Sequence, residues 1–157
     1  MKKYIIAVAV FISTAVSVSA QSKKNAQVSR LYANYLAVKT ALASDNASAT
    51  AKAASDFSET AAAIDKKAVP GKSLTSLKKE AAVISGNKNI EAQRKAFHGL
   101  SDEMIILTRE FRISDNPVYV QYCPMADASW LSSEKKIVNP YYGSAMLSCG
   151  NIKAEIK

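Results

Sequence analysis

The sequence predicts a mainly α-helical domain that resembles a four-helix bundle, with a small C-terminal β-ribbon and loops that carry Cys and Met. Two observations predict this fold. Apolar residues recur at intervals of three and four through the first two-thirds of the chain, and β-branched and aromatic residues become dense only after Pro117. A chain of 157 residues, 48% of them hydrophobic, is typical of one globular domain.

The first twenty residues have the three regions of a secretory signal peptide. Lys2 and Lys3 precede an uncharged apolar run, and Val18-Ser19-Ala20 supplies small residues before a cleavage point. We therefore expect residues 1–20 to be removed and residues 21–157 to form a single mature domain that is periplasmic or secreted. The apolar run is too short for a permanent membrane anchor, because a spanning helix needs about 20 apolar residues.

Four helices are predicted within residues 25–112, where they form the bundle. The first covers residues 25–44, and the second is an Ala-rich segment that starts near residue 47 and ends at Pro70-Gly71. A shorter third helix includes residues 74–84, and a fourth covers residues 89–111. The fourth has the clearest apolar seam, formed by Ile90, Phe97, Met104 and Phe111. Helices with short connections bury their apolar stripes by packing antiparallel.

Residues 113–157 are predicted to form strands and loops that pack on the bundle. Alternation over residues 118–122 and 152–156 indicates a two-stranded ribbon, and we assign Trp130-Leu131-Ser132 and residues 139–143 to loops and turns. Because an isolated hairpin is marginally stable in water, the ribbon should lie on the helices.

Several classes of function are disfavoured by composition and motifs. The 21 Lys and Arg outnumber the 13 Asp and Glu, which gives a net charge of +8, or +6 without Lys2 and Lys3. The lysine pairs are dispersed and have no interleaved aromatic residues, so we expect no nucleic-acid binding. With one histidine, no Gly-rich nucleophile turn and no phosphate-binding loop, the sequence does not predict an enzyme.

The two cysteines each have a methionine nearby, and this is the most informative pattern in the chain. Cys123 and Met125 share a side of an extended segment, and Met146 and Cys149 share a face of a helical turn. Thiolate and thioether ligands select Cu(I), and by the same softness Ag(I), over hard cations. Cys123, Met125, Met146 and Cys149 are therefore the candidate metal ligands.

A structural disulfide is the open alternative, because exported proteins usually oxidise an even pair of cysteines. Spacing alone favours this alternative, and the chain-entropy model gives such a bridge about 3 to 4 kcal/mol of stabilisation. Met125 and Met146 would then fill gaps in the core. The protein would act as an interaction module whose exposed aromatic residues Trp130, Tyr141 and Tyr142 dock a partner.

Two residues of the fourth helix, His98 and Met104, are reserve ligands. They are six residues apart, so they do not share a helix face and at most one is expected to join the sulfur set. Met104 belongs to the apolar seam, which makes it a core residue first. His98 lies next to that seam at the border of the core.

The residues of the C-terminal third resemble a known family. Tyr122-Cys123-Pro124-Met125-Ala126, Asn139-Pro140-Tyr141-Tyr142-Gly143 and Met146-Leu147-Ser148-Cys149-Gly150 are similar to blocks of the family catalogued as domain of unknown function 3347. The resemblance implies an exported helical domain that occurs alone or attached to periplasmic adaptor subunits of heavy-metal efflux pumps. It therefore implies a role in copper or silver handling, with such an adaptor as partner. The shorter segment between Ala126 and Trp130 is a departure from the family pattern.

Overall fold

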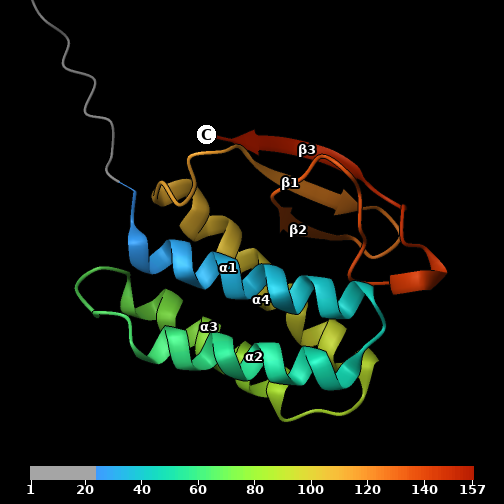
Figure 1. The fold of residues 1–157 in the computed structure, drawn as a ribbon, viewed down its shortest axis with the longest axis horizontal. Helices are drawn as coiled ribbons and strands as arrows, with labels where there is room; N and C mark the ends of the chain where they lie inside the picture. Colours follow the sequence, from blue (N-terminus) through green and yellow to red (C-terminus); the bar gives the residue numbers. More distant parts are fainter. Residues whose placement is uncertain (1–23) are drawn as a thin grey trace, which may run out of the picture.

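The computed structural model describes residues 24–157 and consists of four helices followed by a small sheet (Figure 1). The predicted signal peptide, residues 1–20, lies outside the described residues. The elements are α1 (Ala26–Ala43), α2 (Ala47–Ala62), α3 (Gly71–Ser85), α4 (Ile90–Glu110), β1 (Val118–Cys123), β2 (Ala128–Ser132), the 3₁₀ helix η1 (Gly143–Ala145) and β3 (Asn151–Ile156). The prediction of a mainly α-helical fold with a C-terminal β part is confirmed. Across residues 24–157, no helix combines the length and apolar character needed to span a membrane.

Asparagine side chains start three of the four helices. Asn25 accepts hydrogen bonds from the backbone N–H groups of Gln27 and Val28, Asn46 accepts one from Ala49, and Asn89 caps α4 in the same way. The predicted end of the second helix is wrong, because α2 stops at Ala62, well before Pro70. Asp65 explains the early end: its side chain and carbonyl accept bonds from the N–H groups of Lys67 and Ala68, which closes a turn in place of the helix.

Each helix packs against the next one along the chain, and the apolar stripes meet in one core. Phe97 and Met104 of the α4 seam are fully buried, together with Tyr35 of α1 and Phe57 of α2. The rings of Tyr35 and Phe97 stack with centroids 5.2 Å apart. The core is therefore built by the periodic residues that predicted the bundle.

The sheet is antiparallel with the strand order β2-β1-β3. The expected pairing of β1 with β3 is confirmed, since Val118 lies opposite Ile156 and Val120 opposite Ala154. The assignment of Trp130-Leu131-Ser132 to a loop is wrong, because these residues belong to β2 and pair with β1. The ribbon thus has a third strand, and this strand packs on α4.

The hydroxyl of Tyr35 connects the helices to the sheet. It lies 2.8 Å from the Ser101 hydroxyl of α4, and it accepts the backbone N–H of Leu131 in β2 at 3.0 Å. All three residues are buried. As expected, the sheet lies on the bundle, along the side formed by α1 and α4 (Figure 1).

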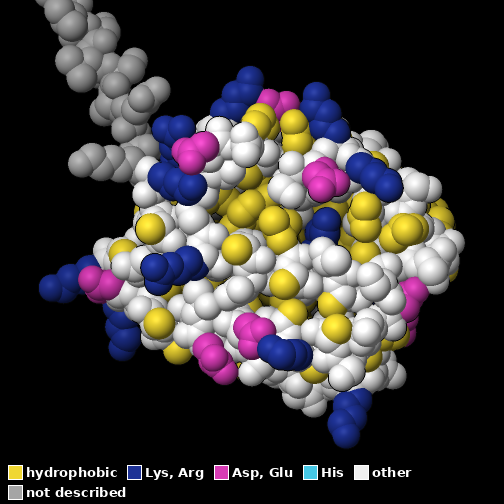
Figure 2. All heavy atoms as spheres, viewed as in Figure 1, with side chains coloured by type: hydrophobic (Ala, Val, Ile, Leu, Met, Phe, Trp, Pro, Cys, Tyr) yellow, Lys and Arg dark blue, Asp and Glu magenta, His cyan; other side chains and the backbone are white. Residues whose placement is uncertain are grey.

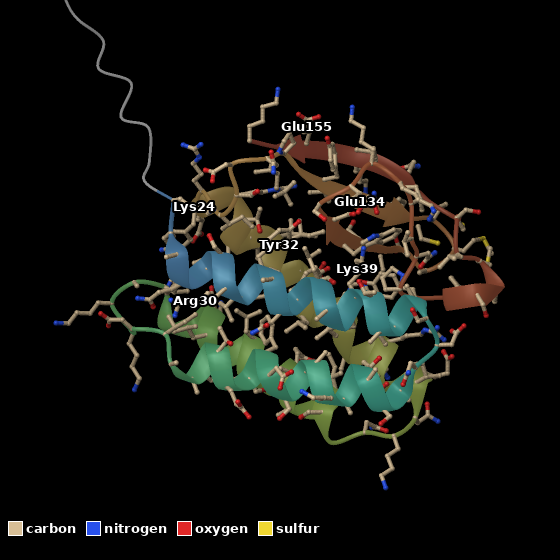
Figure 3. All side chains as sticks on the ribbon, in the orientation of Figure 1. Lys24, Arg30, Tyr32, Lys39, Glu134 and Glu155 are labelled. Atoms are coloured by element: carbon tan, nitrogen blue, oxygen red, sulfur yellow. The ribbon has the colours of Figure 1, made fainter. Side chains whose placement is uncertain are left out.

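The border between α1 and the sheet also holds a buried lysine. Lys39 extends from α1 toward the segment after β2, where Glu134 lies (Figure 3). Burial lowers the pKa of Lys39 because it removes water from the ammonium group, and the charge of Glu134 partly opposes this shift. Elsewhere on the face shown in Figure 2, charges of both signs are scattered.

Arg94 of α4 joins the bundle to the loop that follows β2. Its buried guanidinium donates to the carbonyl oxygens of Leu42, at the end of α1, and Pro140. It also pairs with the carboxylate of Asp45, which in turn accepts the backbone N–H of Ser144 at 2.9 Å. Gly143 leaves room for this pair, because a Cβ there would lie 2.5 Å from Arg94 and closer still to Asp45.

Replacing Asp45 with Asn should make the loop attachment insensitive to acid. Bonds from the hydroxyl and N–H of Ser144, and then Arg94, lower the pKa of Asp45 from 3.8 to about 2. Ionised Asp45 therefore stabilises the folded protein above about pH 4, and this contribution declines as the pH falls toward about 2. Asn also tolerates the left-handed backbone that Asp45 adopts, with φ 55°.

The measurement is chemical denaturation of wild type and Asp45→Asn at several pH values from neutral to strongly acidic. The difference in unfolding free energy between wild type and Asp45→Asn should be constant near neutral pH and should shrink in acid. Asp56→Asn is the control, because the Asp56 carboxylate forms an exposed ion pair with Lys52 on the surface of α2 and should matter little. A difference between wild type and Asp45→Asn that does not change with pH would contradict this role of Asp45.

Candidate functional site

The two cysteines meet at one end of the sheet. Cys123 is the last residue of β1, and Cys149 lies between η1 and β3. Their Sγ atoms are 3.5 Å apart, and both cysteines are free. Cys123 is fully buried, whereas Cys149 is partly exposed. The structure therefore places a dithiol at the surface, with one sulfur inside and one that solvent can reach.

The separation of the two sulfurs is that of two unbonded thiols in contact, and it lies between the spacing of a disulfide and that of two ligands of one metal ion. Sulfurs that bind one tetrahedral metal at about 2.3 Å lie about 3.8 Å apart, and those of a disulfide lie about 2.05 Å apart. The observed 3.5 Å is close to the first value. Among residues 24–157 the structure contains no group of three or more His, Cys, Asp or Glu side chains that could hold a metal ion.

The position of Cys149 depends on Asn139, which is fully buried. The Asn139 amide donates to the carbonyl oxygen of Cys149 at 3.0 Å, and its side-chain oxygen accepts the N–H of Tyr141 at 2.8 Å. The Asn139 backbone N–H donates to Leu147 at 2.8 Å. This network folds residues 139–149 into a compact loop and brings Cys149 back to the end of β1.

The two thiols have unlike proton affinities. Burial raises the pKa of Cys123, but the N–H groups of Ala126 and Met125, the Cys149 thiol and the Asn139 side chain outweigh burial and lower it overall. The pKa of Cys149 is raised, chiefly because its S–H group donates to Cys123. Cys123 is thus the sulfur that ionises more readily, as a metal ligand must.

The methionines lie on the turns beside the dithiol. Met125 follows β1 and is 64% exposed, and Met146 follows η1 and is half-buried. The two turns are joined, since the hydroxyl of Tyr142 donates to the carbonyl oxygen of Met125 at 3.0 Å. Within the second turn, the N–H of Cys149 donates to the carbonyl oxygen of Met146. The four predicted sulfur residues therefore belong to one corner of the molecule, and the two cysteine sulfurs are in contact.

The reserve ligands have different surroundings. His98 is half-exposed on α4; its Nδ1 is 3.2 Å from an Asp102 carboxylate oxygen, and its Nε2 is 3.4 Å from the Asp127 carbonyl oxygen in the turn after Cys123. His98 therefore contacts the turn that carries Met125. Met104 is fully buried and belongs to the hydrophobic core that the helices share.

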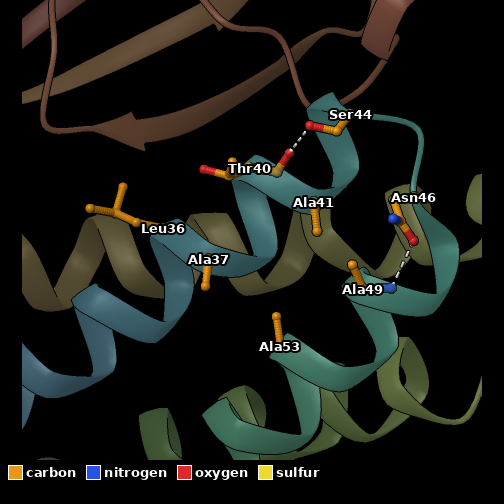
Figure 4. A pocket seen from close by; sticks show the side chains of 8 residues that line it. All are labelled: Leu36, Ala37, Thr40, Ala41, Ser44, Asn46, Ala49 and Ala53. Atoms are coloured by element: carbon orange, nitrogen blue, oxygen red, sulfur yellow. Dashed lines mark hydrogen bonds between the residues drawn. The ribbon is translucent and has the colours of Figure 1, made fainter.

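A groove with a volume of about 600 Å³ adjoins this corner. It is lined by α4 residues including Lys95 and His98, by Glu80 of α3, and by Ala126, Tyr141 and Tyr142. A second groove, about 570 Å³ in volume, lies between α1 and α2, and its lining is mainly alanine with Leu36 (Figure 4). In the second groove, the Ser44 hydroxyl donates to the Thr40 carbonyl oxygen and the Asn46 side chain accepts the N–H of Ala49 (Figure 4). Only the first groove has titratable side chains.

Fold and site together define a mainly helical domain that carries a surface dithiol on a small sheet. The chain matches the family described as Protein of unknown function (DUF3347) over residues 31–116, more than half of its length, and it belongs to that family. The match covers most of α1 and the whole of α2, α3 and α4, and it ends just before β1. No curated protein and no solved structure matches the chain.

Several residues that hold the site carry no metal-binding signal in the sequence. Asn139 orients Cys149, and Gly150 has φ +141° and packs so closely that a Cβ would lie 2.8 Å from the Tyr122 carbonyl oxygen and 3.0 Å from Trp130. In the sequence, the one signal for Asn139 and Gly150 is that they belong to the blocks that resemble the family. Their roles come from contacts across the fold, which spacing does not reveal.

Replacing Gly150 with Ala should displace Cys149. The new Cβ meets backbone and a buried ring, and the left-handed φ disfavours any side chain, so we expect a loss of about 1–3 kcal/mol in stability. The Cys149 thiol should also react faster with an alkylating reagent. Gly71→Ala is the control, because nothing lies within 4 Å of its Cβ position at the start of α3. Unchanged stability and thiol reactivity in Gly150→Ala would show that Gly150 does not position Cys149.

Proposed function

We propose that this protein is a periplasmic carrier of Cu(I) or Ag(I) that performs no chemical reaction of its own. It holds the soft metal ion and passes it to, or keeps it from, a heavy-metal efflux system. The observation that carries the proposal is the contact between Cys123 and Cys149, with Met125 and Met146 on the adjoining turns. Thiolates and thioethers bind Cu(I) in preference to hard cations.

The electrostatic surroundings of the dithiol support the same proposal. Backbone N–H groups and the Asn139 amide stabilise negative charge on Cys123, which is the charge that a metal-bound thiolate carries. The partly exposed Cys149 gives an ion a way in from solvent. Residues 1–20 support export, and the family resemblance supports an efflux adaptor as partner.

The alternative, an interaction module that docks through aromatic side chains, loses part of its basis. Trp130 is fully buried and Tyr141 is 8% exposed, so neither offers the exposed aromatic surface that the sequence suggested. Both rings pack inward, 6.0 Å apart, and the Tyr141 hydroxyl donates to the Ser129 carbonyl oxygen at 2.8 Å. Of the three aromatic residues, only Tyr142 remains partly accessible.

Cys123→Ser should abolish tight Cu(I) binding by the reduced protein. A serine hydroxyl is a harder ligand than a thiolate, so the affinity should fall by more than the roughly 10–100-fold that loss of an outer-shell partner costs. The measurement is competition for Cu(I) with a chromophoric chelator under anaerobic conditions, with circular dichroism to verify the fold. Full affinity in Cys123→Ser would overturn the proposal.

Three further variants serve as matched comparisons in the same titration. Met125→Leu and Met104→Leu remove the same thioether group from two sites, one beside the dithiol and one in the helical core. Met125→Leu should weaken Cu(I) binding, and Met104→Leu should leave it unchanged. His98→Ala should also have little effect, because the Nδ1 and Nε2 atoms of His98 face Asp102 and Asp127.

A further inference from the structure

We infer that Cys149 and Cys123 form a thiol–disulfide exchange pair, in which Cys149 receives a small-molecule disulfide and Cys123 resolves it. The closed Cys123–Cys149 bond would then prevent metal binding. This last consequence rests on the proposed function, whereas the exchange step does not. The pair would thus be a reversible control on the same site.

Access to the two sulfurs is unequal. Cys123 is fully buried at the end of β1, under the turn of residues 124–127. Cys149 is partly exposed in a loop whose neighbouring residues Leu147 and Ser148 are also exposed. A reagent from solvent therefore reaches the Cys149 sulfur first, and Cys149 is the residue that would form a mixed disulfide.

The second sulfur is already in position to complete the exchange. The Sγ atoms are 3.5 Å apart, so they must approach by about 1.5 Å to reach the roughly 2.05 Å of a disulfide bond. The backbone around them is held by the bonds from Asn139 to Cys149 and from Tyr142 to Met125. Because these bonds involve carbonyl oxygens and not the sulfurs, they do not oppose the side-chain rotation at Cys149 that formation of the disulfide would require.

The exchange balances with one small disulfide, RSSR, as oxidant. The Cys149 sulfur gives up its proton and attacks RSSR, which forms Cys149–S–S–R and releases one RSH. The Cys123 sulfur then attacks the Cys149 sulfur, the bond to R breaks, and a second RSH leaves with the proton of Cys123. Two protein thiols are oxidised and one small disulfide is reduced to two thiols.

Oxidation would remove the donors that a soft metal needs. A metal ligand cysteine must be a thiolate, and a disulfide has none. The attachment of the loop through Arg94 and the pairing of β1 with its neighbours use groups other than the two sulfurs. The oxidised and reduced proteins should therefore both stay folded and differ at this corner.

The test exposes the native full chain, without metal, to oxidised glutathione under anaerobic conditions and follows adducts by mass spectrometry. Wild type should form the internal disulfide without accumulating an adduct. Cys123→Ser should accumulate one glutathione on Cys149, and Cys149→Ser should react far more slowly, because its remaining thiol is buried. Equal reaction of the two variants while folded, as judged by circular dichroism, would overturn the assignment, as would a stable adduct on wild type.

A second measurement separates the exchange pair from the proposed function. Oxidised wild type should lose Cu(I) binding in the chelator competition, and treatment with dithiothreitol should restore it. If reduced wild type binds no Cu(I), the proposed carrier function fails while the adduct pattern still decides the exchange pair. If the oxidised protein binds Cu(I) as tightly as the reduced protein, control of the metal site by oxidation is wrong.

Discussion

The buried guanidinium of Arg94 is the contact on which the placement of the candidate site depends. The Arg94 side chain donates hydrogen bonds to the Leu42 carbonyl at the end of α1 and to the Pro140 carbonyl in the C-terminal loop. It also forms an ion pair with Asp45 in the turn between α1 and α2. A buried cation without such partners would be costly, so these segments are tied to each other. Pro140 belongs to the loop of residues 139–149, which ends at Cys149.

The two cysteines of the dithiol are held in place by two separate parts of the structure. Cys123 is placed by β1, the central strand, which is hydrogen-bonded to strands on both sides. Cys149 is placed by the loop that Arg94 attaches at one end and Asn139 closes at the other. Neither of these contacts involves a bond between the two sulfurs, which is the arrangement that the proposed metal site and the proposed exchange both require.

Sequence periodicity predicts the helices well because the apolar stripe of each one faces a single core. The strand β2 escapes prediction because Ala128-Ser129 opens it with small residues, and its strand character comes from pairing with β1. Sequence spacing indicates that each cysteine has a methionine nearby, Met125 for Cys123 and Met146 for Cys149. It does not show that the two cysteines, 26 residues apart in the sequence, are in contact, because that contact depends on the fold. In the sequence, Arg94 is typical of a surface residue of a helix and Asn139 of a turn residue. Their burial and their hydrogen bonds to distant parts of the chain become visible in the structure.

The central claim is that the two cysteine sulfurs bind one soft metal ion together. X-ray absorption spectroscopy at the copper edge, on reduced protein loaded with one equivalent of Cu(I), tests this claim most directly because it identifies the atoms bound to copper. We expect a nearest shell with at least two sulfur atoms, which is lost when both Cys123 and Cys149 are replaced by Ser. A nearest shell of nitrogen and oxygen alone, or a sulfur shell that survives in the double variant, would contradict it.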